Sequence, residues 1–383
     1  MKLITNSISA YCNKMATLHS LSMSPGIFSR TIILFAACLI LSGCVSRPLQ
    51  PYSTDTTPQM LVPAIQTPTQ DKRARFREIF CTILEARKET TPDYRECREA
   101  LTTVGQEQAP TGEAINLNIS TSGLEAVFVP GLGRDCVEQW LATENTIPTH
   151  LASQGYPMHS LNINGLGSSE GNAHKIRDEL MAIPDSSVSP KLVFIAYSKG
   201  AIDLITAIIN YPEIESRVAA VVSLAGAIGG SPLANYVTRG QLNLIQHFPG
   251  ATCEAVDPGA LQDLKPETRQ KWLAETVLPG GIPYYSIITF PHPKNISTGL
   301  EISYRKLAKV DARNDGQLIF YDQFIPGSTL VAYLNADHWA AATPISRTHP
   351  VVGALFTNEN AFPREALFEA IMRFVEEDLK TTQ

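Results

Sequence analysis

Residues 191–205 contain a serine whose neighbours are of the types that a nucleophile requires. Residues 192–196 form an unbroken apolar run, which is typical of a strand in the middle of a parallel sheet. Ser198 follows, with Ala196 two positions before it and Gly200 two positions after it. Small side chains at both places permit a tight turn from strand into helix, which would lift the hydroxyl above the sheet edge. The pattern indicates nucleophilic chemistry, and a serine that only caps the helix is the alternative.

A serine hydroxyl needs a general base near neutral pH, and the base needs an acid to orient it. His338 lies just beyond a late apolar run at residues 330–334, so we expect it at the same sheet edge as the serine. Four aspartates precede it closely enough to serve as the acid: Asp311, Asp315, Asp322 and Asp337. We select Asp315 because Asn314-Asp-Gly316 is a turn sequence that would present the carboxylate. Asp337 adjoins the histidine and would usually point away.

The negative charge that develops on a reacting carbonyl oxygen needs amide donors. The residue after the nucleophile usually supplies one, which here is Lys199. A loop after an earlier strand usually supplies the other, and Pro130-Gly-Leu-Gly133 follows the apolar run at 124–129. Leu132 is the expected donor in this loop. A Gly-Leu-Gly triplet is also a common turn, since it recurs at residues 165–167.

Strand and helix patterns alternate regularly around these residues. Apolar runs predict strands at residues 124–129, 158–163, 192–196, 218–224, 284–290 and 329–334. This alternation is typical of a mostly parallel sheet with helices on both faces. The rhythm breaks at about residues 226–281, where glycines and prolines mix with short helical pieces, and we expect a cap insertion there. An amphipathic helix is expected at residues 363–379.

Taken together, the glycine-rich loop, the serine turn, Asn314-Asp-Gly316 and Asp337-His-Trp339 resemble the lipase and esterase branch of the α/β-hydrolases. The resemblance covers the chain from about Leu124 to the C-terminal helix. It implies an α/β-hydrolase fold in which Ser198, His338 and Asp315 cleave a carboxylic ester or thioester through an acyl-enzyme. Two departures are Pro130, where many lipases have histidine, and Ala196, where the turn usually has glycine.

The same residues leave other activities open. Acyl transfer to an alcohol would use the same triad, and a noncatalytic protein could keep the fold as a binding scaffold. We expect an ester or an acylated small molecule or lipid as substrate, with no cofactor. The remaining histidines lack metal-ligand spacing, so no metal is expected. No protein partner is indicated by the sequence.

Residues 1–43 contain basic side chains and no acids, and they include an apolar run at 31–41 that is too short to span a bilayer. These features predict an export signal, whose translation start could also be Met15 or Met23. Leu41-Ser-Gly-Cys44 resembles the lipobox of bacterial lipoproteins, which implies a diacylglyceryl group on Cys44. The next residue is Val45, whereas an aspartate at this position commonly holds such lipoproteins in the inner membrane. The resemblance therefore implies attachment to the outer membrane. We therefore expect a protein anchored in the bacterial cell envelope, with residues 44–70 as a flexible tether.

Four of the seven cysteines would remain unacylated after export: Cys81, Cys97, Cys136 and Cys253. An even number in an oxidising compartment favours disulfides. We pair Cys81 with Cys97 by proximity, which leaves Cys136 with Cys253. Since a helix break at residues 91–93 separates the first pair, residues 71–110 are expected to form a stapled helical hairpin before the main domain at 111–383.

The length of the chain suits a catalytic domain, and its charge pattern argues against a nucleic-acid-binding protein. The 383 residues are 44% hydrophobic, which suits one substantial catalytic domain. The formal net charge is −6 and the charges are interspersed. Because no basic stripe is present, we do not expect nucleic acid as a partner.

Replacing Cys44 with serine should release the protein from membrane fractions, because the acylation site is lost. An acylated cysteine of this kind carries more than one chain, which stable anchoring requires. Metabolic labelling with a fatty-acid analogue and cell fractionation measure both effects. Retention of label and of membrane association in the Cys44→Ser variant would contradict the prediction.

Overall fold

The computed structural model describes residues 70–134, 136, 146–183, 191–238, 240, 257, 259–348, 350–357 and 361–382. Every described residue belongs to one compact unit, Gln50–Gln383. The predicted export signal, Cys44 and the tether up to residue 69 lie outside the described residues.

A six-stranded sheet forms the centre of the described part of the chain, in the strand order β2-β1-β3-β4-β5-β6. The strands are β1 (Leu124–Val129), β2 (Met158–Ser160), β3 (Lys191–Tyr197), β4 (Val218–Leu224), β5 (Tyr284–Thr289) and β6 (Thr329–Leu334). Every pairing between neighbours is parallel, so the carboxyl ends of all strands meet at one edge. This confirms the predicted mostly parallel sheet.

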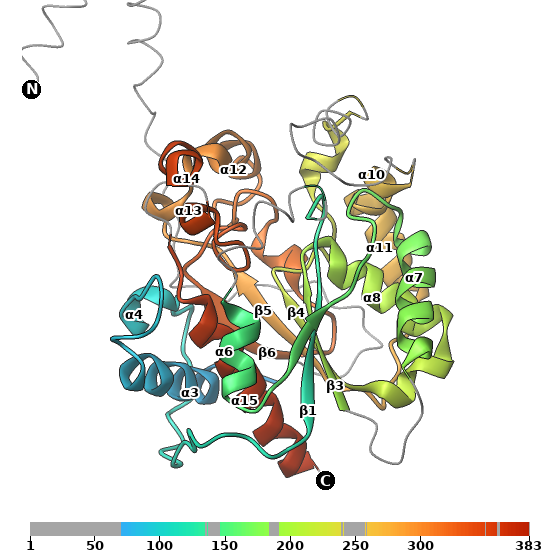
Figure 1. Cartoon of the computed structure of the whole chain (residues 1–383). Helices are drawn as coiled ribbons and strands as arrows, with labels where there is room; N and C mark the ends of the chain where they lie inside the picture. Colours follow the sequence, from blue (N-terminus) through green and yellow to red (C-terminus); the bar gives the residue numbers. More distant parts are fainter. Residues whose placement is uncertain are drawn as a thin grey trace, which may run out of the picture. The chain divides into compact units, whose positions relative to one another are not determined.

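Helices cover both faces of the sheet (Figure 1). The α-helices are α3 (Arg73–Ala86), α4 (Cys97–Ala100), α6 (Ile147–Ser153), α7 (Ser169–Ala182), α8 (Lys199–Asn210), α10 (Ala260–Asp263), α11 (Pro266–Glu275), α12 (Glu301–Leu307), α13 (Ile345–Thr348), α14 (Pro350–Phe356) and α15 (Arg364–Thr382). Short 3-10 helices are η2 (Pro212–Arg217), η3 (Pro232–Asn235), η4 (Pro293–Asn295), η5 (Thr298–Leu300) and η6 (Phe320–Gln323). In Figure 1, α3, α6 and α15 lie on one side of the sheet, and α7, α8 and α11 lie on the other.

The side chains of β3 alternate between two buried cores. Val193 and Ile195 belong to the core that includes α3, α6 and α15, whereas Leu192 and Phe194 belong to the core that includes α7 and α8. Both faces of a parallel strand are therefore apolar, which explains why the sequence shows an unbroken run rather than an alternating one.

Helix α3 carries an apolar stripe at helical spacing, which includes Phe76, Phe80 and Leu84. The stripe packs against α15, where the ring of Phe76 meets Phe374 edge-on at a centroid distance of 5.9 Å. Phe80 stacks on Phe362, just before α15, at 6.4 Å. The first and last long helices of the described chain are thus joined in one core.

The segment before β1 also pairs with strand β6. Asp71 forms a parallel bridge with Leu330, and Leu101 forms an antiparallel bridge with Leu334. The predicted hairpin at residues 71–110 is present as α3 and α4, but it belongs to the main core and does not precede it as a separate element. An apolar stripe shows that a helix packs on something, and it does not show on what.

The predicted cap insertion at about residues 226–281 is described in part. It contains η3, α10 and α11, while residues 241–256 lie outside the described residues. Trp272 and Leu273 of α11 pack against the core that includes α7 and α8. The described part of the insertion therefore covers a flank of the sheet.

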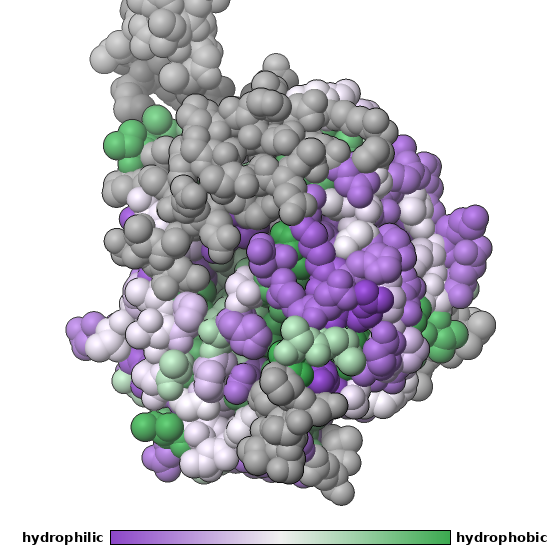
Figure 2. Space-filling view, turned by 45° about the vertical axis from the view of Figure 1, so that its right-hand side comes forward, coloured by the Kyte–Doolittle hydropathy of each residue, from purple (hydrophilic) through white to green (hydrophobic). Residues whose placement is uncertain are grey.

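Most of the residues that Figure 2 colours are hydrophilic or intermediate, and the hydrophobic ones form small groups. Exposed large apolar side chains among the described residues include Ile302 on α12 and Val351 and Leu355 on α14. Among the described helices, none is both long and apolar enough to cross a membrane.

Cys81 of α3 and Cys97 of α4 form a disulfide, with their Cα atoms 5.2 Å apart. This is the predicted pairing. Cys136 is also disulfide-bonded. Its predicted partner, Cys253, lies outside the described residues.

Replacing both Cys81 and Cys97 with serine should lower the free energy of unfolding by about 3 kcal/mol, because a loop of roughly this length loses its cross-link in the unfolded chain. Denaturant titration measures the change. Substitution is preferable to a reducing agent, which would also reach Cys136. An unchanged denaturation midpoint in the double variant would show that the disulfide does not stabilise the fold.

Candidate active site

The turn between β3 and α8 holds Ser198 in an uncommon backbone conformation, with φ 55° and ψ −125°. Non-glycine residues rarely adopt positive φ, and such residues cluster at functional sites. The space around the turn is as tight as the sequence predicts. A Cβ at Gly200 would lie 2.4 Å from the carbonyl oxygen of Pro130, and one at Gly131 would lie 2.8 Å from the Cβ of Ser198. The glycines are thus needed because the loop after β1 touches the serine.

Ser198, His338 and Asp315 form one hydrogen-bonded chain. The Nε2 atom of His338 lies 2.9 Å from the Oγ of Ser198. Its Nδ1 atom lies 2.8 Å from the Oδ2 of Asp315. Asp315 is fully buried, while Ser198 and His338 are 8% and 6% exposed. The structure therefore brings together the three residues that the sequence selected, from three separate loops at the carboxyl edge of the sheet.

The carboxylate of Asp315 is held by several further donors. Its Oδ1 accepts hydrogen bonds from the backbone N–H groups of Gln317 and Leu318, at 2.9 and 2.7 Å. Its Oδ2 accepts one from the hydroxyl of Thr289, at 2.6 Å. Gln323 in turn accepts from the backbone N–H of Thr289 at 2.7 Å. These contacts leave the carboxylate little freedom, so it can fix the histidine ring.

Sequence reasoning missed Thr289 and Gln323. Thr289 is the last residue of β5, so its place at the carboxyl edge was a usable signal. Gln323 lies in η6, and nothing in its local sequence distinguishes it.

The other three candidate aspartates have different roles. Asp311 pairs with Arg313 at 2.7 Å. Asp337 accepts hydrogen bonds from the backbone N–H groups of Ser297 and Ala340, at 2.8 and 2.9 Å, and so shapes the turn that carries His338. Burial raises the pKa of the Asp322 carboxyl to about 7.

One predicted oxyanion residue adjoins Ser198 in the chain, and the other lies in the loop that passes close to it. Lys199 is the first residue of α8, and Leu132 is in the loop that touches the serine. This loop is tied to the second Gly-Leu-Gly turn, because the backbone N–H of Gly133 donates to the carbonyl of Gly165 at 3.0 Å. The second Gly-Leu-Gly turn therefore helps to hold the loop that lies beside Ser198.

The side chain of Lys199 forms a buried ion pair that sequence reasoning did not identify. Its Nζ donates to Asp203 at 2.7 Å, and the two side chains are 1% and 2% exposed. Asp203 also accepts from the amide of Asn172 at 2.7 Å, and Asn172 accepts from the backbone N–H of Asn164 at 3.0 Å. Burial raises the pKa of Asp203, although Lys199 opposes the shift. The network joins α8 to α7 and to the loop after β2.

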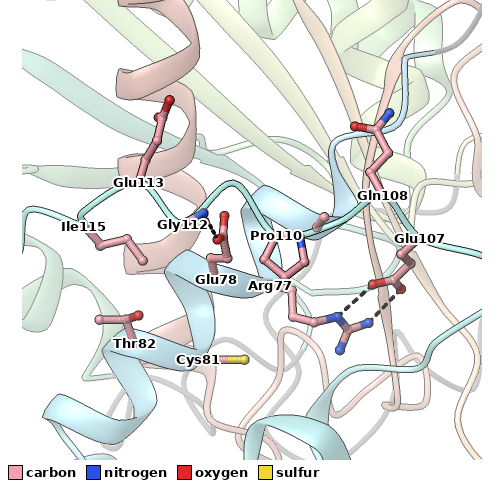
Figure 3. Close-up of a pocket in the computed structure, with 11 residues that line it drawn as sticks. Arg77, Glu78, Cys81, Thr82, Glu107, Gln108, Pro110, Gly112, Glu113 and Ile115 are labelled. Atoms are coloured by element: carbon pink, nitrogen blue, oxygen red, sulfur yellow. Dashed lines mark hydrogen bonds and ion pairs between the residues drawn. The ribbon is translucent and has the colours of Figure 1, made fainter.

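A cavity of about 600 Å³ lies away from these residues, between α3 and the segment 107–115. Figure 3 shows that two of its three acidic side chains have partners: Glu107 pairs with Arg77, and Glu78 accepts from the backbone N–H of Gly112. None of Ser198, His338 and Asp315 lines it.

Within the described residues, no group of histidine, cysteine, aspartate and glutamate side chains could hold a metal ion.

The chain is similar to several solved hydrolases. The metagenomic carboxyl esterase MGS0156 is 37% identical over 84% of this chain and 97% of that one, with a TM-score of 0.76. The mature Bacillus licheniformis lipase BlEst2 is 20% identical over 64% and 96% of the two chains, with a TM-score of 0.48. The Legionella pneumophila phospholipase PlaB is 12% identical over 68% and 64%, with a TM-score of 0.41. The last two scores are too low to carry an argument.

The match to MGS0156 reaches beyond the segment that the sequence pattern covers. Residues from Leu124 onward make up about two thirds of the chain, so a match over 84% includes part of the segment before β1. Neither the protein-family models nor the curated proteins include a match to the chain.

Replacing Lys199 with methionine should lower the free energy of unfolding by about 3–5 kcal/mol, because it leaves the buried Asp203 carboxylate without its cation. The double variant Lys199→Met, Asp203→Leu should recover much of this loss. Lys88→Met is the control, since Lys88 pairs with Glu96 on the surface and should change stability little. Equal losses in the Lys199 and Lys88 variants would contradict the buried-pair argument.

Proposed function

The chain belongs to the α/β-hydrolase family that includes the carboxyl esterase MGS0156, and on this premise we propose that it cleaves carboxylic esters with Ser198 as nucleophile. The observation that carries the proposal is the continuous hydrogen-bonded chain from Ser198 through His338 to Asp315. In such a chain the histidine removes the serine proton and the carboxylate stabilises the imidazolium that results.

Acylation begins when the Oγ of Ser198 attacks the carbonyl carbon of the ester while its proton passes to the Nε2 of His338, 2.9 Å away. The tetrahedral intermediate then collapses, the carbon–oxygen bond to the alcohol breaks, and the same proton passes to the departing alcohol. A water molecule repeats the sequence on the acyl-enzyme and releases the acid. A thioester would follow the same steps with a thiol as leaving group.

Backbone amides of Leu132 and Lys199 are proposed to stabilise the oxyanion. Two features support this assignment. Lys199 begins α8, and the N-terminus of a helix favours negative charge. The loop of Leu132 passes so close to Ser198 that a Cβ at Gly131 would lie 2.8 Å from the Cβ of Ser198, which supports an amide donor in this loop.

Asp315 is suited to its proposed role because it is fully buried yet hydrogen-bonded on both oxygens. With Nδ1 of His338 donating to this carboxylate, the lone pair on Nε2 is left to accept the serine proton. We further propose that the enzyme is anchored in the bacterial cell envelope through Cys44, on the support of the apolar run at 31–41 and of Leu41-Ser-Gly-Cys44.

Replacing Asp315 with asparagine should lower kcat for a short activated ester by about three to four orders of magnitude while KM stays similar, as loss of the orienting carboxylate does in other triads. Ser198→Ala and His338→Ala should abolish most turnover. Asp311→Asn is the matched control, because Asp311 pairs with Arg313 and should alter kcat by only a few-fold.

A fluorophosphonate probe identifies the nucleophile directly. It should label the unmodified protein at Ser198 and leave Ser198→Ala unlabelled. If the unmodified protein shows neither ester turnover nor labelling, it is a noncatalytic scaffold and the proposed function is wrong. If Asp315→Asn keeps a kcat near that of the unmodified protein while another aspartate variant loses most of its kcat, only the orienting acid is misassigned.

A further inference from the structure

Tyr197 is the last residue of β3 and immediately precedes Ser198. Neighbouring strand residues point to opposite faces, so Ala196 belongs to the core of α7 and α8, and Tyr197 belongs to the core on the other side. Its side chain therefore extends under the sheet edge, towards the loop that follows β6.

The phenol of Tyr197 contacts the loop that carries His338. Its hydroxyl donates a hydrogen bond to the backbone carbonyl of His338 at 2.6 Å, in a buried environment. The hydroxyl of Thr343, later in the same loop, is a second hydrogen-bond partner. The tyrosine ring lies 5.1 Å from the imidazole, centroid to centroid, and it also stacks with Phe128 at 6.4 Å.

The backbone of His338 is thereby held at both of its polar atoms. Its carbonyl accepts from Tyr197, and its N–H donates to the carbonyl of Asp315 at 3.0 Å. One contact comes from the residue beside the nucleophile and the other from the acid itself. The hydrogen bond between Nδ1 and Asp315 then sets the ring orientation.

We propose that the hydroxyl of Tyr197 is a positioning group for the reaction: by fixing the carbonyl of His338, it keeps Nε2 within reach of Ser198. The inference rests on the proposed function. A proton transfer across 2.9 Å is sensitive to small displacements, since a shift of about 1 Å can cost roughly 100-fold in rate.

The chemistry of the phenol suits a permanent donor. Burial raises the pKa of Tyr197 well above its ordinary value, and the nearby Asp315 and Asp337 carboxylates act in the same direction. The hydroxyl therefore stays protonated throughout the working range of a histidine base, and it can donate to the carbonyl at every stage of the cycle.

Tyr197→Phe tests the proposal because it removes the hydroxyl and keeps the ring. We expect kcat for a short activated ester to fall by roughly 10- to 100-fold with KM within about two-fold, together with a matching fall in the rate of fluorophosphonate labelling. The matched control is Tyr333→Phe on β6. The hydroxyl of Tyr333 is buried and has no hydrogen-bond partner among the described residues, so its removal should leave kcat within about two-fold.

A second measurement separates positioning from general damage. In a His338→Ala background, Tyr197→Phe should change the residual rate by less than about two-fold, because the group that it positions is absent. An equal fall in both backgrounds would show a merely structural role and overturn the inference, as would full activity of Tyr197→Phe alone. An unmodified protein without turnover or labelling would instead overturn the proposed function.

Discussion

The strained turn at Ser198 is the constraint on which the site depends. A serine with φ 55° is unfavourable by itself, and it persists only where the surrounding structure determines the backbone. Strand β3 holds one side of the turn through its pairing with β1 and β4. Helix α8 holds the other side, because ten of its twelve residues are buried against the sheet and its neighbours. The hydroxyl of Ser198 is thus placed by a strand and a helix that are almost completely buried.

Around this turn, the buried charged side chains are matched by hydrogen-bond partners. Lys199, Asp203 and Asn172 satisfy one another behind the helix, and Thr289 and Gln323 satisfy Asp315 on the opposite flank. Unpaired groups at such depth would cost several kcal/mol, whereas a complete network rigidifies the site. The geometry of Ser198, His338 and Asp315 therefore depends on the hydrogen bonds of the surrounding core as well as on the contacts among the three residues.

Much of this arrangement could be predicted from local sequence, and the rest depends on long-range contacts. The serine turn follows from spacing alone, because the small residues at 196 and 200 are required within one turn of chain. Asp315 could be chosen among four aspartates because a turn sequence presents it. Tyr197, Thr289 and the Lys199–Asp203 pair could not be assigned, since their roles depend on partners that are set by the fold. The same reason explains why α3 was expected in a separate hairpin, since an amphipathic pattern does not show which element covers the apolar face.

The pairing of the first described segment with β6 also has a consequence for how the protein is made. β6 ends the sheet, and an open edge strand is a template for pairing with other chains. Asp71 and Leu101 occupy backbone positions along that edge, and α3 rests on α15, the last helix of the chain. The segment from Asp71 to Leu101, which covers this edge, is therefore synthesised well before β6 and α15. Neither β6 nor α3 can complete its contacts until the C-terminal part of the chain has been made. Such long-range closure slows folding and leaves apolar surface of α3 exposed on the nascent chain until α15 packs against it.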